Sequence, residues 1–208
     1  MIPDAIDHHD QIASGAWANW LWLADPPSLQ SALCLGYGAG AAQALSRRFD
    51  RVERASAEPE VLTQSWEVET FDLIALNTAE AAGNGVSPDT LWPVCVRLLR
   101  PGGCLALVTD NPLWYRRLPR VQSALAQVIR ASRRDRSLRR AGFRAIHRYY
   151  MAPSACEPHC FIPANRHAVA GYERVAMKLS TRGTLRSRLG RAGLHPLLYP
   201  STLHLAYR

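Results

Sequence analysis

A glycine-rich stretch near the start of the chain has the spacing most typical of a ligand site. Gly36, Gly38 and Gly40 alternate with Tyr37 and Ala39, between a short apolar run and a stretch of helical character. Glycines at such a junction let the backbone approach a ligand closely, and the first amides of the following helix can donate to its polar groups. A tight strand-to-helix turn without a ligand fits the motif equally well.

A second group brings together side chains that bind metals. Cys156, His159 and Cys160 place two thiols and an imidazole within five residues, and His167 lies close behind. Thiolate and imidazole ligands suit zinc, but this spacing matches no standard zinc site. We therefore expect no metal here.

The densest basic patch is a third candidate. Its six arginines lie within eleven positions and could contact phosphate or RNA: Arg130, Arg133, Arg134, Arg136, Arg139 and Arg140. Because no aromatic residues are interleaved and no binding module is recognisable, the pattern favours a solvated helix face over nucleic-acid binding.

Composition limits the class of protein. The 208 residues are enough for one domain with an elaboration. The net charge of +8 comes with 24 arginines among 25 basic residues, and it favours solvated helix faces over an acidic substrate or a membrane surface. No apolar run approaches a membrane span and no signal peptide begins the chain, so we expect a cytoplasmic protein with reduced cysteines.

Alternating strands and helices are expected to position the glycines. Strands are predicted at 31–35, 71–76, 104–109, 144–151 and 202–207, and helices at 41–49, 89–99, 118–131, 166–179 and 184–192. This alternation predicts an α/β fold, a mostly parallel sheet with helices on both faces, which binds ligands at the carboxyl ends of its strands. Asp110, Asn111 and Trp114 follow the third strand and would lie at the rim of that cleft.

The expected organisation is a single domain in four parts. Residues 1–30 form an N-terminal helical segment, 31–151 a Rossmann-like core, 152–200 a helical insertion, and 201–208 the last strand.

Four motifs in this order resemble those of class I S-adenosylmethionine (SAM) dependent methyltransferases. Residues 33–40, Leu-Cys-Leu-Gly-Tyr-Gly-Ala-Gly, resemble the family's first motif, and Phe-Asp-Leu-Ile at 71–74 is similar to its fourth strand. Leu-Leu-Arg-Pro-Gly-Gly at 98–103 resembles the turn into strand five, and Leu-Arg-Arg-Ala-Gly-Phe at 138–143 the helix before strand six. The resemblance covers most of residues 31–151 and implies the Rossmann-like class I methyltransferase fold.

The resemblance also implies a cofactor site. Gly36, Tyr37, Gly38 and Gly40 would hold the methionine part of SAM, and Asn77 would lie near the sulfonium and the methyl acceptor. Transfer would be an in-line displacement that depends on positioning and desolvation, so no catalytic residue is named.

At the end of strand two, where the family has an acidic residue that accepts both ribose hydroxyls, this chain has Ser56. Glu58 or Glu53 would substitute if the strand were shifted.

Strand three of the family has little room in this chain. Only eight residues, 63–70, separate Leu62 from the strand at 71–76, and a parallel crossover needs about ten to twelve. We expect strand three to be missing or replaced by residues 64–68. The insertion, where the family commonly has a short hairpin, could be a lid, a substrate platform or a partner-docking surface.

Two functions remain in close balance. The intact glycine loop and Asn77 favour a SAM-dependent methyltransferase acting on a small molecule or a biosynthetic intermediate. The missing acid and the short strand-three region favour a methyltransferase-like accessory or scaffolding subunit that docks on a protein partner. RNA binding is a less favoured third hypothesis.

Overall fold

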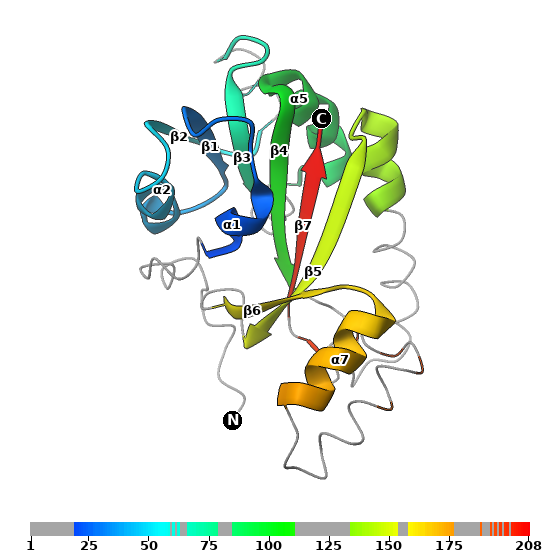
Figure 1. The fold of residues 1–208 in the computed structure, drawn as a ribbon. Coiled ribbons are helices and arrows are strands. Elements are labelled where there is room, and N and C mark those ends of the chain that lie inside the picture. The colour runs from blue at the N-terminus through cyan, green and yellow to red at the C-terminus, as the bar shows by residue number, and fades with distance from the viewer. Residues whose placement is uncertain are drawn as a thin grey trace, which may run out of the picture.

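One seven-stranded sheet organises the chain (Figure 1). The computed structural model describes residues 19–58, 60, 62, 66–78, 85–110, 134–153, 158–176 and 201–208, with single positions at 188, 192, 194, 196, 198 and 199. The strands lie in the order β2-β1-β3-β4-β7-β5-β6. Their bounds are β1 Ser31–Leu35, β2 Arg51–Ala55, β3 Phe71–Asn77, β4 Leu99–Asp110, β5 Ala145–Pro153, β6 Pro158–Pro163 and β7 Ser201–Tyr207.

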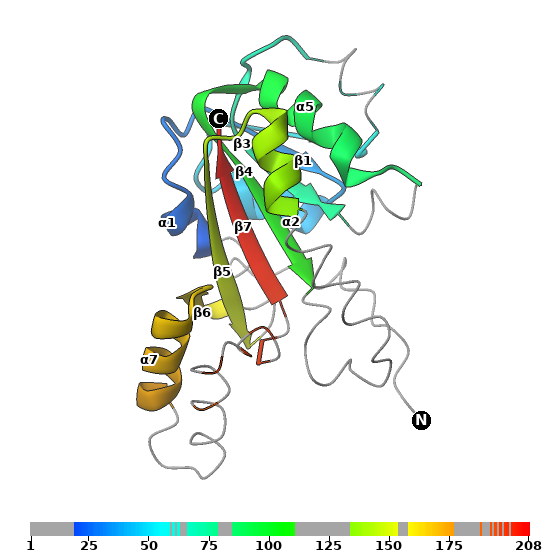
Figure 2. The same cartoon turned by 90° about the vertical axis from the view of Figure 1, so that its right-hand side faces the viewer.

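Helices cover both faces of the sheet (Figure 2). The labelled helices are α1 Leu21–Ala24, α2 Ala39–Leu45, α5 Pro88–Leu98 and α7 Arg166–Ala176, and residues 134–141 are also helical. The first two pack on one face through Trp20 and Leu45, and α5 packs on the other through Trp92. None of the helices in the described part of the chain is long and apolar enough to cross a membrane.

The central strands are apolar on both sides because each faces two cores. Ala32 and Cys34 of β1 belong to the core under α1 and α2, and Leu33 and Leu35 belong to the core under α5. Successive side chains of a strand point to opposite faces, so an unbroken apolar run is what a doubly covered strand requires. The predicted α/β sheet with helices on both faces is thus confirmed, although the sheet is mixed and not mostly parallel, because β7 and β6 pair antiparallel with their neighbours.

Strand direction defines the edge at which ligands would bind. Strands β2, β1, β3 and β4 run parallel, and β7 lies antiparallel between β4 and β5. The strands β1, β3, β4 and β5 therefore end on the same side of the sheet, which we call the carboxyl edge.

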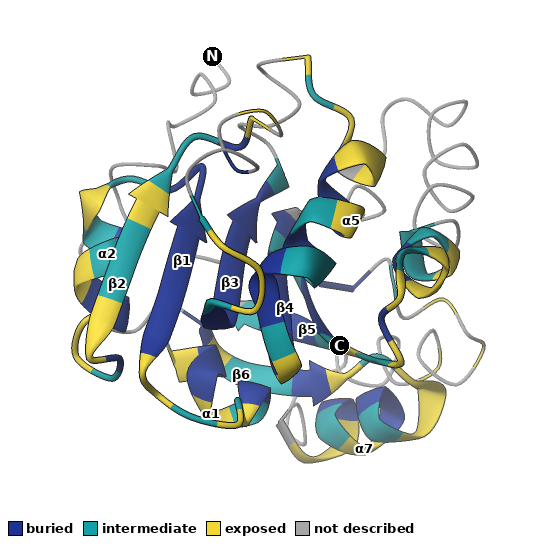
Figure 3. Ribbon diagram, turned by 90° about the horizontal axis from the view of Figure 1, so that it is seen from above, coloured by how far each residue is buried: buried dark blue, intermediate teal, exposed yellow. Residues whose placement is uncertain are grey.

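No strand lies outside β2 among the residues that the structure describes. Strand β2 pairs with β1 alone, and its half-exposed side chains mark the rim of the sheet in Figure 3. Residues 66–70 form no strand, and the Trp66 indole donates a hydrogen bond to the Glu53 carboxylate on β2. The expected loss of strand three is borne out in this part of the chain.

The insertion differs from the expectation of helices alone. Helix α7 matches the start of the helix predicted at 166–179, but β6 precedes it and pairs antiparallel with β5. Proline cannot donate to a ladder and is tolerated at the edge of a sheet, where Pro158 and Pro163 bracket this short strand. The helices predicted at 118–131 and 184–192 lie wholly or mostly outside the described residues.

A buried carboxylate holds the amino ends of the strands together. Asp72 is 1% exposed and accepts hydrogen bonds from the Ser31 amide at 2.9 Å and from Arg100 Nη1 at 3.2 Å. The Ser31 hydroxyl also lies 3.3 Å from Asp72 Oδ2 and donates to the Thr70 carbonyl at 2.6 Å. This network lies at the edge opposite the glycine loop.

Candidate functional site

The glycine loop begins with a backbone conformation that favours glycine. Gly36 has φ +68°, in the left-handed region where a side chain is strained. Its amide donates to the Ala55 carbonyl at 3.1 Å, at the end of β2. The loop is thereby fixed to the neighbouring strand.

Asn77 holds the other side of the same residue. It is the last residue of β3, is 6% exposed, and its Nδ2 donates to the Gly36 carbonyl at 2.8 Å. The predicted neighbourhood of the glycine loop and Asn77 is therefore present, and the amide side chain positions the loop.

Gly38 connects the loop to the next helix. It is the N-cap of α2 with an extended backbone, φ −66° and ψ 175°, and makes no side-chain cap hydrogen bond. A glycine cap supplies no acceptor to the amides of the first turn, which suits them to an acceptor on a ligand. Gly40 lies in that first turn and is half-buried.

Tyr37 lies inside the protein and does not face a cleft. Its side chain is 8% exposed and packs in the core under α1 and α2. Its carbonyl accepts a hydrogen bond from Arg54 Nη2 at 3.4 Å, a contact between β2 and the loop that the sequence did not predict. Tyr37 therefore contributes to the core under α1 and α2.

The position expected to hold the ribose is occupied by Ser56. Strand β2 ends at Ala55, which is paired with Leu35, so Ser56 lies next to Gly36 as the alignment predicted. Ser56 is half-buried and Glu58 is exposed. A serine hydroxyl donates one hydrogen bond and accepts others, unlike the carboxylate usual in the family, which only accepts.

Glu53 does not take the ribose position. It is paired with Leu33 in the middle of β2, so the strand is not shifted. Its carboxylate is already bound by Arg51 and by the Trp66 indole. The alternative that placed Glu53 at the ribose is wrong.

The rim residues are placed only in part. Asp110 ends β4 and its backbone pairs with Ser201 of β7, so it lies at the carboxyl edge. Asn111 and Trp114 fall outside the described residues.

Cys34 of β1, Cys95 of α5 and Cys104 of β4 are buried thiols. Burial raises the pKa of Cys34 to about 12 and that of Cys95 to about 12, and it raises the pKa of Cys104 further. All three are neutral at physiological pH and pack as small apolar groups.

The Cys and His group of the insertion is placed only in part. His159 and Cys160 lie on β6, and Cys156 is outside the described residues. Within the described part of the chain, no three His, Cys, Asp or Glu side chains gather to hold a metal ion.

Comparison with known proteins identifies the fold. No family model matches the sequence, and no curated protein matches it. A SAM-dependent methyltransferase from Archaeoglobus fulgidus is similar in structure, with a TM-score of 0.57 and 12% identity over 93% of this chain and 92% of that one.

A larger enzyme is similar as well. The phosphoethanolamine N-methyltransferase 2 of Haemonchus contortus, in complex with S-adenosyl-L-methionine, gives a TM-score of 0.56 and 14% identity, over 97% of this chain and 56% of that one. The chain has the fold of class I SAM-dependent methyltransferases.

Proposed function

We propose that this protein is a SAM-dependent methyltransferase acting on a small molecule or a biosynthetic intermediate. The observation that carries the proposal is the tethered Gly36, whose amide is bound by the end of β2 and whose carbonyl is bound by Asn77 at the end of β3. A left-handed glycine fixed at the meeting point of three parallel strands is a preorganised cradle at the carboxyl edge.

The residues present fit the methionine end of SAM better than its nucleoside end. Gly36 has a left-handed backbone and Asn77 fixes its conformation, and Gly38 and Gly40 have no side chains to cover the loop. On the ribose side Ser56 offers one hydroxyl, and no strand lies beyond β2 in the described residues to cover an adenine ring. We expect binding to be weaker than a carboxylate at this position would give.

Methyl transfer from SAM requires little of the protein beyond positioning the cofactor and the acceptor. When bound, SAM would supply an electrophilic methyl group for an in-line displacement. The glycine loop would orient the cofactor, and elements at the carboxyl edge would place the acceptor and exclude water.

The second candidate is an accessory or scaffolding subunit with this fold. Ser56 at the ribose position and the open edge at β2 favour it, because both weaken the nucleoside half of the site. RNA binding has less support, because one arginine of the basic patch, Arg134, contacts Thr109 of β4 and does not join a solvated face.

Isothermal titration of the folded chain with SAM and with S-adenosylhomocysteine separates the two candidates. The proposal expects saturable heat with both ligands. Absence of heat at millimolar ligand would leave the accessory role as the better account.

A further inference from the structure

A cluster of polar side chains lies on the face of the sheet covered by helix 134–141. Thr109 ends the buried part of β4 and is paired with Thr202 of β7, and His204 of β7 is paired with Arg148 of β5. Arg134, the first described residue of helix 134–141, donates a hydrogen bond to Thr109. The cluster lies toward the carboxyl edge, and Val108, beside Thr109, is paired with Asn77 of the candidate SAM site.

Arg134 is a half-buried cation whose hydrogen-bond partner among the described residues is a neutral hydroxyl, that of Thr109. Its Nη1 donates to Thr109 Oγ1 at 3.1 Å, and Thr109 Oγ1 lies 2.9 Å from Thr202 Oγ1. A guanidinium has five N–H donors, and taking it out of water without an anion is unfavourable. Burial lowers the pKa of Arg134, although Asp135 and Asp89 act in the opposite direction.

Neither nearby carboxylate forms a hydrogen bond to Arg134. Asp89 Oδ1 accepts from Ser137 Oγ at 2.6 Å and from Trp92 Nε1 at 3.0 Å. Asp135 Oδ2 lies 3.5 Å from Arg148 Nε, and its Oδ1 lies 4.0 Å from His204 Nε2. The charge on Arg134 is therefore not matched by a bonded anion in the described part of the protein.

Two buried polar atoms of the cluster have no hydrogen-bond partner in the described structure. They are His204 Nδ1, on a residue 3% exposed, and Asp135 Oδ1. Buried polar atoms of this kind are rare in folded proteins and commonly indicate a bound water. The Asp135 oxygen is an acceptor, so a water and not an anion would be its partner. The cluster is also reachable, because Asp135 is 28% exposed and Arg148 is 42% exposed.

Few acidic residues follow Asp110 in the sequence, so few carboxylates of the chain could pair with Arg134. Nineteen of the 25 Lys and Arg residues follow Asp110, but only three of the 17 acidic residues do: Asp135, Glu157 and Glu173. Glu173 is buried and accepts a hydrogen bond from the Tyr199 hydroxyl at 2.7 Å. An anion for Arg134 is more readily supplied from outside the chain.

We propose that Arg134, with the free hydroxyl donor of the hydrogen-bonded pair Thr109 and Thr202, binds an oxyanion group, a phosphate or a carboxylate, carried by the methyl acceptor. Guanidinium and hydroxyl donors suit such a group, and hydrogen bonds to a charged partner are the strong ones. That the methyl acceptor carries this group rests on the proposed function. Thr109 lies one strand from Asn77 but on the opposite face of the sheet, so the acceptor would reach both around the carboxyl edge. The anion site itself stands on the cluster alone.

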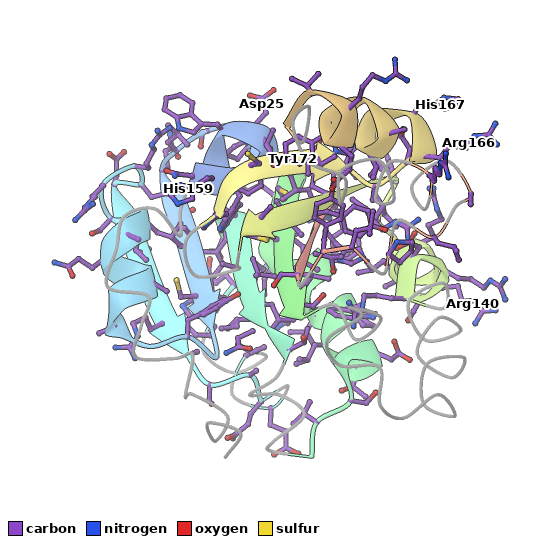
Figure 4. All side chains as sticks on the ribbon, turned by 90° about the horizontal axis from the view of Figure 1, so that it is seen from below. Asp25, Arg140, His159, Arg166, His167 and Tyr172 are labelled. Atoms are coloured by element: carbon purple, nitrogen blue, oxygen red, sulfur yellow. The ribbon has the colours of Figure 1, made fainter. Side chains whose placement is uncertain are left out.

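Exposed arginines of the same helix provide the control. Figure 4 views the molecule from the side on which β4 and β5 end, and Arg140 points away from the sheet into solvent. Arg136 is exposed as well. Arg136→Gln removes the same charge from the same helix without touching the cluster.

Binding of inorganic phosphate and of acetate tests the site, by isothermal titration and by the shift of Tm at constant ionic strength. The parent and Arg136→Gln should bind one of the two probes and gain Tm. Arg134→Gln should bind that probe about tenfold more weakly. Phosphate binding indicates a phosphorylated acceptor, and acetate binding a carboxylated one.

The unliganded variants separate binding from a structural role. Arg134→Gln should keep or raise the Tm without ligand, because it removes a cation without a bonded anion. If Arg134→Gln does not fold, Thr109→Val should show the same weakened probe binding. Equal probe binding in all variants, or no binding to the parent, would overturn the anion site.

S-adenosylhomocysteine titrated into the same proteins keeps the two proposals apart. Arg134→Gln should bind it as the parent does. A parent that binds a probe through Arg134 but not S-adenosylhomocysteine would support the anion site and refute the proposed function.

Discussion

At the scale of single residues, the proposed cofactor site depends on one backbone conformation and one side chain, those of Gly36 and Ser56. Gly36 has the left-handed φ that keeps the loop open, and Asn77 fixes it by a 2.8 Å hydrogen bond. Ser56 stands where the family has a carboxylate, next to the same loop. The loop geometry was predictable from glycine spacing, but the Asn77 contact joins residues 41 positions apart and required the fold.

Restoring a carboxylate at the ribose position should strengthen cofactor binding. We expect Ser56→Asp to lower the Kd for SAM by about tenfold, because charged acceptors form the stronger hydrogen bonds with hydroxyls. Isothermal titration measures the change. Ser46→Asp, which adds the same charge at the exposed end of α2, should bind SAM as the parent does. Unchanged or weaker binding by Ser56→Asp would show that Ser56 does not face the ribose.

At the scale of elements, the strands were predicted within a few residues wherever an apolar run ended in a turn signal. The run at 71–76 became β3, Phe71–Asn77, and the run at 202–207 became β7, Ser201–Tyr207. Strand β6 was missed because it is bracketed by prolines and gains its stability from pairing with β5. The Asp72 network was also missed, since Ser31, Asp72 and Arg100 are far apart in the sequence.

The Asp72 network should support stability without affecting ligand binding. Asp72→Ala leaves the buried Ser31 amide without its acceptor, and we expect a loss of about 2 kcal/mol in the free energy of unfolding. Urea denaturation measures the loss, with Asp50→Ala, at an exposed position, as the matched control. Because the network lies opposite the carboxyl edge, the Kd for SAM should not change; a large change would contradict this separation of roles.

At the scale of the whole molecule, charge is distributed unevenly along the sequence, which the net charge alone does not show. The net charge of +8 combines an acidic stretch through Asp110 with a strongly basic remainder. Strand β7, close to the end of the chain, inserts between β4 and β5, and so places His204 among residues from helix 134–141 and β5. The sequence predicted the strands, but only the sheet order brings Arg134, Asp135, Arg148 and His204 together.

Stability should fall in acid because of His204. Burial, with Arg134 and Arg148 nearby, lowers the pKa of His204 from 6.5 to about 3. The unfolded chain therefore takes up one more proton than the folded protein between these pH values. The free energy of unfolding should decrease as the pH falls through this window, by up to about 1.4 kcal/mol per pH unit.

Urea denaturation between pH 7 and pH 4 measures this dependence. His204→Gln should flatten the curve, whereas His159→Gln, at an exposed position of β6, should not. A curve for His204→Gln as steep as that of the parent would mean that other groups cause the acid sensitivity.

The central claim is that the loop around Gly36 binds SAM, and titration of S-adenosylhomocysteine into the parent and Gly36→Val tests it most directly. Valine at φ +68° is strained and should shift the loop, so the parent should give saturable heat and the variant none. Gly171→Ala in α7, where a Cβ meets nothing within 4 Å, should bind as the parent does. Equal binding by the parent and a folded Gly36→Val, or no binding by the parent, would contradict the account.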